Sequence, residues 1–134
     1  MYNKTDRRKY TRFNVPDAKV KYQQEKGFQG SEGFSGLGKM IDLTLYAVKF
    51  ETKHELTQGA KIQIWITLDE KNIIPLIGNV LWAFSEKNNH SKNATVEFSA
   101  FAKEKGFNSI ESKKALEQLS EKYEPLATKV IFDY

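Results

Sequence analysis

The sequence contains no cysteine, which excludes disulfides, thiolate nucleophiles and thiolate metal sites. Because small secreted domains usually need disulfides, we expect a cytoplasmic protein. Long apolar runs are also missing, since no segment approaches the about 20 consecutive apolar residues of a membrane-spanning helix. The first residues, MYNKTDRRKY, lack the apolar core of a signal peptide. We therefore expect neither a membrane span nor export.

Residues typical of catalytic centres are scarce as well. The two histidines, His54 and His90, both stand among polar residues that favour surface turns. We interpret them as surface residues, because neither belongs to a cluster with the spacing of metal ligands. The phosphate-binding motif GxxxxGK[ST] and the nucleophile motif GxSxG are absent. We expect a protein that is not an enzyme and that holds no metal or other cofactor.

The positive charge is concentrated near the start of the chain. The 134 residues suit one domain and carry a net charge of +4. Residues 1–26 contain eight Lys or Arg against three acids, whereas the rest contain thirteen against fourteen. Such a local excess indicates either a solvated terminus or a site for an anionic partner, which is a nucleotide, a nucleic acid or a lipid.

Most of the chain has the pattern of β-strands. In residues 60–68, Ile62, Ile64 and Ile66 alternate with polar residues, as in a half-buried strand. Gly78 interrupts another such run and predicts a bulge or bend. Five of the eight glycines fall within residues 27–38, which predicts a flexible loop. The predicted strands cover residues 18–22, 39–44, 48–52, 60–68, 73–84 and 94–101.

Only the end of the chain has a helical pattern. Asn108 and Glu111 have the spacing of a capping box, and apolar residues recur from Ile110 to Tyr123. Residues 129–132 are interpreted as a short last strand or a tail. The pattern predicts a mainly β protein, a small antiparallel six-stranded β-barrel with a C-terminal α-helix. We expect residues 1–14 to form a flexible basic segment and residues 15–134 to form the barrel domain.

Two short motifs stand in a fixed order before and within this pattern. Arg8-Lys9-Tyr10-Thr11-Arg12 has the form RxxxR, and Asp42-Leu43-Thr44-Leu45-Tyr46-Ala47 places an acid and a hydroxyl two residues apart. Together the two motifs resemble those of the PilZ domain family, which has RxxxR followed by [D/N]xSxxG. Gly78-Asn79-Val80-Leu81-Trp82 and Ala94-Thr95-Val96-Glu97-Phe98 are similar to two later strands of that family and are interpreted mainly as core.

The resemblance implies a sensor that binds cyclic di-GMP, a bacterial second messenger, without turning it over. Arg8 and Arg12 would grip phosphate or guanine, and Asp42 would either accept hydrogen bonds from a guanine edge or orient an arginine. The ligand would order the N-terminal segment over the barrel, and the domain would signal to a downstream protein partner. The ligand site implied by the resemblance consists of Arg7, Arg8, Arg12, Asp42, Thr44 and Ala47.

Two departures from the family pattern leave a second function open. Thr44 stands in place of the usual serine, and Ala47 in place of the usual glycine. If the position of Ala47 requires a positive φ, its methyl group opposes ligand binding. The chain would then be a degenerate PilZ domain that acts as a ligand-independent protein-interaction module. A third hypothesis is a basic small barrel that binds nucleic acid; Asp42 has no role in it, and we rank it last.

Overall fold

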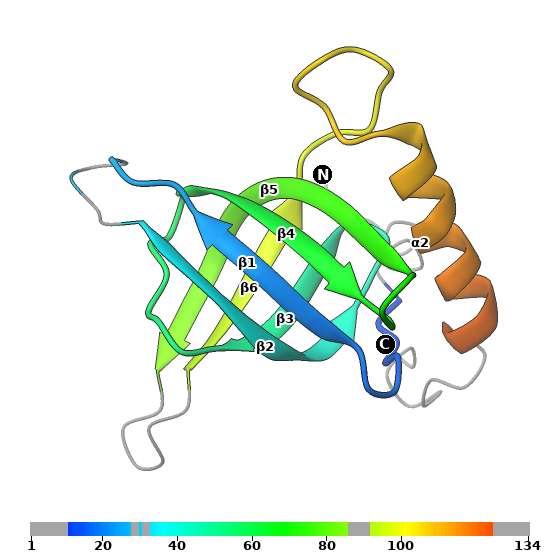
Figure 1. Ribbon diagram of the computed structural model, residues 1–134, viewed down its shortest axis with the longest axis horizontal. Coiled ribbons are helices and arrows are strands. Elements are labelled where there is room, and N and C mark those ends of the chain that lie inside the picture. Colours follow the sequence, from blue (N-terminus) through cyan, green and yellow to red (C-terminus); the bar gives the residue numbers. More distant parts are fainter. Residues whose placement is uncertain (1–10, 28–29, 31–32, 86–91, 125–134) are drawn as a thin grey trace, which may run out of the picture.

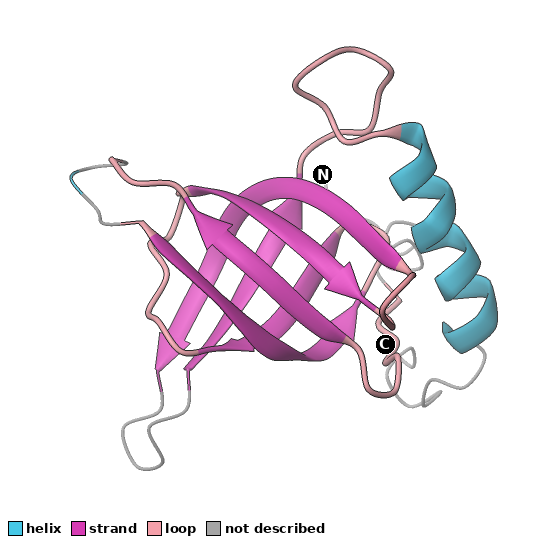
Figure 2. Ribbon diagram, viewed as in Figure 1, coloured by secondary structure: helices cyan, strands magenta, loops and turns pink. Residues whose placement is uncertain are grey.

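The computed structural model describes residues 11–27, 30, 33–85 and 92–124, which form six strands and the helix α2 (Figure 1). Most of this part of the chain is strand, and the helix lies at one end of the barrel (Figure 2). The elements are β1 (Lys19–Gln24), β2 (Phe34–Leu43), β3 (Ala47–Thr52), β4 (Lys61–Thr67), β5 (Ile73–Ser85), β6 (Lys92–Phe98) and α2 (Ile110–Tyr123).

The six strands close into an antiparallel barrel in the order β1-β2-β3-β6-β5-β4. Each of these strands pairs on both sides, so closure removes the free edges that an open sheet would present. The predicted six-stranded barrel with a C-terminal helix is therefore confirmed.

The barrel interior is filled by the alternate side chains of all six strands. In β4 the buried residues are Ile62, Ile64 and Ile66, as the alternation predicts, and Val96 and Phe98 of β6 also face inward. Burying such apolar side chains supplies the main favourable free energy of folding. The largest fully buried side chains are Tyr22, Phe50, Met40, Leu43, Ile62, Ile64, Ile66 and Leu116.

The loop predicted over residues 27–38 is wrong in its second half, because β2 begins at Phe34. The glycines there serve close packing rather than flexibility. A Cβ atom on Gly36 would overlap the phenol ring of Tyr22, and one on Gly38 would collide with the carbonyl oxygen of Glu51 on β3. A dense run of glycine can therefore mark a strand where a barrel brings backbones close together.

Gly78 plays the same part in β5, where a Cβ atom would collide with the carbonyl oxygen of Glu97 on β6. The bulge predicted at this glycine lies instead three residues later, where the pairing with β6 shifts between Val80 and Trp82. Leu81 is the extra residue. Because side chains alternate along a strand, one extra residue reverses which of the following side chains face outward.

The helix begins one residue later than the capping-box spacing predicts. Ser109 is the N-cap, and its hydroxyl accepts a hydrogen bond from the Ser112 amide nitrogen. Asn108 has a different role: its buried side-chain amide accepts from the Ile77 nitrogen at 2.7 Å and donates to the carbonyl oxygens of Ile77 and Ser99. These bonds join the loop before α2 to the barrel. Residues 129–132 lie outside the described residues.

His54 is not the surface residue that its polar neighbours predict. It is half-buried, its ring stacks on Phe34 with 5.0 Å between the ring centroids, and its Nδ1 lies 2.9 Å from the hydroxyl of Tyr22. The Tyr22 hydroxyl also accepts a hydrogen bond from the Lys53 nitrogen. His54 therefore helps to close the end of the barrel where β1 ends and β2 begins. His90 lies outside the described residues.

Candidate ligand-binding site

The segment before β1 is attached to the end of β2 by a two-residue bridge. The Phe13 nitrogen donates to the Leu43 oxygen at 2.9 Å, and the Leu43 nitrogen donates to the Phe13 oxygen at 2.9 Å. The Asn14 side chain adds a hydrogen bond to the Ile41 oxygen at 2.7 Å. Phe13 is only 3% exposed and Leu43 is fully buried. Because these two residues face the core, their neighbours Arg12 and Asp42 are turned outward, at the same end of the barrel.

Asp42 faces outward because β2 also contains a bulge. The pairing of β2 with β3 shifts between Met40 and Asp42, and after this shift Asp42 pairs with Lys49. Burial raises the pKa of the Asp42 carboxyl, and the positive charges of Arg12 and Lys49 partly oppose this rise. The site therefore contains a half-buried carboxylate close to two cations.

Thr44 holds the turn between β2 and β3. Its hydroxyl oxygen accepts hydrogen bonds from the backbone nitrogens of Tyr46 at 3.0 Å and Ala47 at 2.9 Å. The Thr44 nitrogen donates in turn to the Ala47 oxygen at 2.9 Å, and the residue is only 7% exposed. This arrangement is a hydroxyl-capped turn, in which the side chain fixes the backbone that follows it.

Ala47 is the first residue of β3 and pairs with Glu97 of β6. Among the described residues that are not glycine, only Asp17 has a positive φ. The backbone at position 47 therefore does not require glycine, and the alanine is accommodated without strain.

A row of outward side chains leads from Asp42 across three further strands. Asp42 pairs with Lys49 of β3, Lys49 pairs with Thr95 of β6, and Thr95 pairs with Trp82 of β5. Trp82 is 60% exposed. The interpretation of Trp82 as part of the core pattern is thus wrong, because the bulge at Leu81 turns the ring outward. We call these four residues the Asp42–Trp82 row.

A shallow hollow of about 210 Å³ lies along this row, lined by Lys49, Trp82, Asn93, Ala94 and Thr95. The side-chain oxygen of Asn93 is buried and has no hydrogen-bond partner among the described residues. A buried acceptor without a partner favours a ligand or water that donates to it. The two-residue alternation of β3 and β6 indicates that Lys49 and Thr95 face outward. Only the pairing register places them in one row with Asp42.

The turn also borders a groove of about 400 Å³ beneath α2. Leu45 and Tyr46 from the turn line one part of the groove, and Leu116 of the helix lines another. The backbone of the turn is joined to β6 as well, since the Phe98 nitrogen donates to the Tyr46 oxygen at 2.8 Å. The turn therefore contacts β6 of the barrel and borders the groove beneath the helix, so a change in its conformation would alter both.

The structure brings together four of the six site residues that the resemblance implies. Arg12, Asp42, Thr44 and Ala47 all lie at the junction of the N-terminal segment with the turn between β2 and β3. Arg7 and Arg8 lie outside the described residues. Within the part of the chain that the structure describes, no group of three or more His, Asp or Glu residues could hold a metal ion.

Comparison with solved structures identifies the fold as PilZ-like. The chain is similar to the PilZ domain with c-di-GMP of YcgR from Escherichia coli, with 15% sequence identity and a TM-score of 0.55 over 96% of this chain and 99% of that one. It is also similar to the Bacillus subtilis inhibitor of motility MotI/DgrA, with 17% identity and a TM-score of 0.57 over 84% of this chain. The chain spans only 49% of the length of MotI/DgrA.

No protein-family model matches the sequence, and no curated protein matches it. The likeness to solved structures therefore rests on the three-dimensional arrangement of the strands and the helix. In the part of the chain that is described, no helix has the length and apolar character needed to cross a membrane.

Proposed function

We propose that this domain binds cyclic di-GMP and does not turn it over. The observation that carries the proposal is the bridge between Phe13 and Leu43, which holds Arg12 beside Asp42 and beside the Thr44 turn. The YcgR domain that shares the fold was solved with c-di-GMP. Arg12 and Asp42 supply complementary groups for such a ligand, which carries two phosphates and two guanines.

Each of these two side chains has a chemical role in the proposed complex. The guanidinium group of Arg12 is exposed and can form paired hydrogen bonds with phosphate oxygens or with guanine O6 and N7. The carboxylate of Asp42 can accept hydrogen bonds from guanine N1–H and N2–H. Arg7 and Arg8 belong to the same proposed site as further cations, of which Arg8 is the second arginine of RxxxR.

Thr44 and Ala47 contribute to the proposed site through the backbone of the turn. The Thr44 hydroxyl already accepts two backbone hydrogen bonds, so we assign it the role of holding the turn in shape. The methyl group of Ala47 adds little volume and causes no backbone strain. The substitution of alanine for glycine is therefore compatible with a ligand that lies over the start of β3.

The Asp42–Trp82 row extends the proposed site along the barrel. Lys49 adds a positive charge next to Asp42, and the exposed ring of Trp82 offers an apolar face on which a purine can stack. Base–aromatic stacking is worth about 1–3 kcal/mol per base. This extent suits a ligand with two bases better than it suits a single mononucleotide.

The same geometry suggests how binding would reach a downstream partner. A ligand held by Arg12 would fix the N-terminal segment against the turn, and the turn contacts the groove beneath α2 through Leu45 and Tyr46. Ligand binding would thus select one arrangement of the segment and the groove. A partner protein that recognises this arrangement would bind only the liganded domain.

Calorimetric titration with cyclic di-GMP tests the proposal. We expect micromolar or tighter binding by the wild-type chain and a loss of about 2–3 kcal/mol, roughly 30- to 150-fold in affinity, in Arg12→Ala and in Asp42→Asn. Glu70→Gln is the matched control, because Glu70 is an exposed carboxylate in the turn between β4 and β5. Absence of heat and of a thermal shift with saturating ligand would refute the proposal and favour the degenerate PilZ domain.

Asp42→Asn also separates a binding role from a structural one. Because burial raises the pKa of Asp42, the ionised carboxylate is less favourable in the folded chain than in the unfolded chain at neutral pH. We therefore expect Asp42→Asn to melt at the same or a higher temperature than the wild type while it loses affinity. A lower melting temperature would assign Asp42 to the stability of the fold instead.

A further inference from the structure

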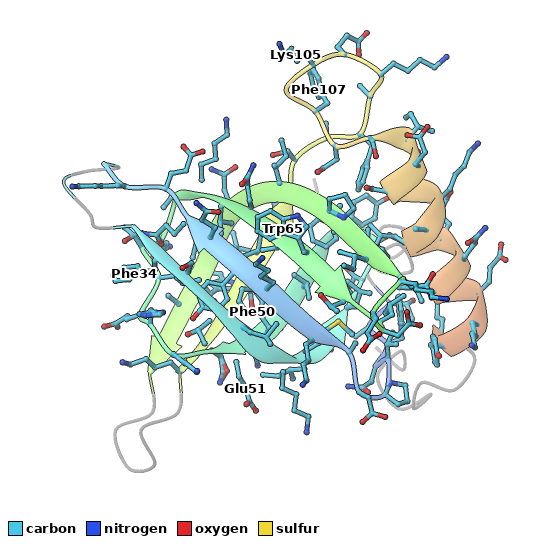
Figure 3. The ribbon with its side chains drawn as sticks, in the orientation of Figure 1. Phe34, Phe50, Glu51, Trp65, Lys105 and Phe107 are labelled. Atoms are coloured by element: carbon cyan, nitrogen blue, oxygen red, sulfur yellow. The ribbon has the colours of Figure 1, made fainter. Side chains whose placement is uncertain are left out.

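The barrel has a second distinctive surface on the side away from the Asp42–Trp82 row. It is formed by the outward side chains of β1 and β4 and by their register partners on β2 and β5; we call it the lysine wall. In the closed order of strands, β1 and β4 stand opposite β3 and β6. Figure 3 looks onto this wall, with Trp65 near its middle and Phe107 on the loop above it.

The charge of this wall has one sign. Its outward positions include four exposed lysines, and no aspartate or glutamate occurs among the residues that pair β1 with β2, β1 with β4, or β4 with β5. Like charges so close together repel one another, and a negatively charged partner removes that cost. The lysines are Lys19, Lys21, Lys39 and Lys61.

Apolar side chains lie between these lysines. One register row runs through Leu37, Lys21, Trp65 and Pro75, and Leu37 is 47% exposed. The Lys21 ammonium nitrogen lies 5.4 Å from the centre of the Trp65 ring, which is a cation–π geometry. The wall thus combines a fixed aromatic ring and exposed aliphatic groups with positive charge.

A hollow at the upper edge of the wall can receive one side chain. Its volume is about 200 Å³, and Trp65, Pro75 and Phe107 are among the residues that line it. Phe107 is 47% exposed, although it is a large apolar residue. Protein interfaces commonly centre on one large side chain that enters such a hollow, with charged groups around it.

We propose that the lysine wall docks a partner protein that presents Asp or Glu side chains around one large apolar residue. The carboxylates would face the lysines, and the apolar residue would enter the hollow between Trp65 and Phe107. Nucleic acid fits less well, because Lys21 covers the Trp65 ring and the aliphatic groups have no counterpart on a phosphate backbone. A membrane fits less well, because insertion of Leu37 or Trp65 would carry the neighbouring lysines into the lipid.

This inference does not depend on nucleotide binding, and the two tryptophans distinguish the two surfaces. The chain contains two tryptophans, one on each side of the barrel, so a ¹⁵N spectrum has one indole N–H signal for each side. Cyclic di-GMP should shift the signal of Trp82 and leave that of Trp65. A partner on the lysine wall should do the reverse.

The probe is a short synthetic peptide with glutamates around a single phenylalanine, titrated into the labelled full chain. We expect it to shift the Trp65 indole signal, and we expect about tenfold weaker binding when glutamine replaces the glutamates or serine replaces the phenylalanine. Lys21→Glu and Leu37→Ser, both at exposed positions, should also weaken binding about tenfold. Lys114→Glu, at an exposed position of α2, is the matched control and should leave binding unchanged.

Three results would overturn the inference. The first is a peptide that binds equally well with serine in place of phenylalanine, which would leave only non-specific charge attraction. The second is a stronger shift of the Trp65 signal with a single-stranded oligonucleotide or with phosphatidylglycerol vesicles than with the peptide. The third is peptide binding that shifts the Trp82 signal and not that of Trp65.

Discussion

The two sides of the barrel carry one tryptophan each, and the surroundings of the two rings differ. Trp65 lies under the ammonium group of Lys21, in strand pairs that contain exposed lysines and no aspartate or glutamate. Trp82 is 60% exposed and stands in a row that contains the half-buried carboxylate of Asp42. The charged groups of the first surface attract only negative charge, whereas the second surface combines an acceptor, cations and an exposed ring for a ligand with both polar edges and phosphates.

Both surfaces are built on one core. The core stabilises the fold, and the outward side chains determine what each surface can bind. Most of the inward side chains of the six strands are apolar and give the barrel its stability. The outward side chains do not pack in the core, so most replacements there should cost little stability. Mutations that change one side should therefore leave the other side intact unless they disturb a strand that both sides share.

The largest effect is expected from Gly38→Ala, which affects both surfaces through β2. A Cβ atom at this position would collide with the Glu51 carbonyl oxygen, so the pairing of β2 with β3 must shift. We expect a loss of at least about 3 kcal/mol in the free energy of unfolding, measured with urea. The control is Ser35→Ala, at an exposed outward position of the same strand. If both variants were equally stable, the close approach of Gly38 to the Glu51 carbonyl oxygen would be contradicted.

Replacement of each tryptophan by alanine tests directly which side of the barrel binds the nucleotide. Trp82→Ala should weaken cyclic di-GMP binding by about 1–3 kcal/mol, because it removes a stacking surface. Its melting temperature should change little, since the ring is mostly exposed. Trp65→Ala should leave the affinity for cyclic di-GMP unchanged. Calorimetry measures the affinity of both variants for cyclic di-GMP. An equal loss of affinity in the two variants would mean that the ligand does not lie along the Asp42–Trp82 row.

A smaller effect concerns the pKa of Asp42. Arg12 lowers this pKa while burial raises it, so Arg12→Ala should raise it further. Because the pKa in the folded chain lies above that in the unfolded chain, ionisation of Asp42 reduces stability as the pH rises through this interval. Ligand affinity should fall as the pH decreases through the same pKa. A ¹³C titration of the Asp42 carboxyl measures the shift, and Lys61→Ala, on the other side of the barrel, should not change it.

The smallest effect is expected from Ala47→Gly. Since the backbone at this position has no positive φ, glycine relieves no strain and should cost roughly 0.5–1 kcal/mol of stability. The affinity for cyclic di-GMP should change by less than about tenfold, or 1.4 kcal/mol. A much larger gain in affinity would show that the alanine methyl group occupies space that the ligand needs.

The fold was largely predictable because strand alternation is a local property. The buried residues of β4 and β6 follow their two-residue period, and this period alone indicates a strand with one buried face. The loop predicted over residues 27–38 failed for a non-local reason, since Gly36 and Gly38 are required by residues on β1 and β3. The N-cap was missed by one residue because Asn108 binds Ile77, which is distant in sequence.

The candidate site was predictable only in part. Motif order pointed to Arg12 and Asp42, and the structure brings their charges together. Lys49, Thr95 and Trp82 could not be assigned, because their neighbourhood depends on the pairing of β2, β3, β6 and β5. Register of this kind is set by contacts between strands and has no local signature in the chain.

The two bulges make the Asp42–Trp82 row depend on the number of residues in a strand as well as on their identity. Asp42 and Trp82 each follow one extra residue, Ile41 in β2 and Leu81 in β5. Deletion of either extra residue would turn the side chain after it toward the core, although no residue of the row had been replaced. When related sequences are aligned to this one, a single gap near position 41 or 81 therefore separates chains that keep the row from chains that have lost it.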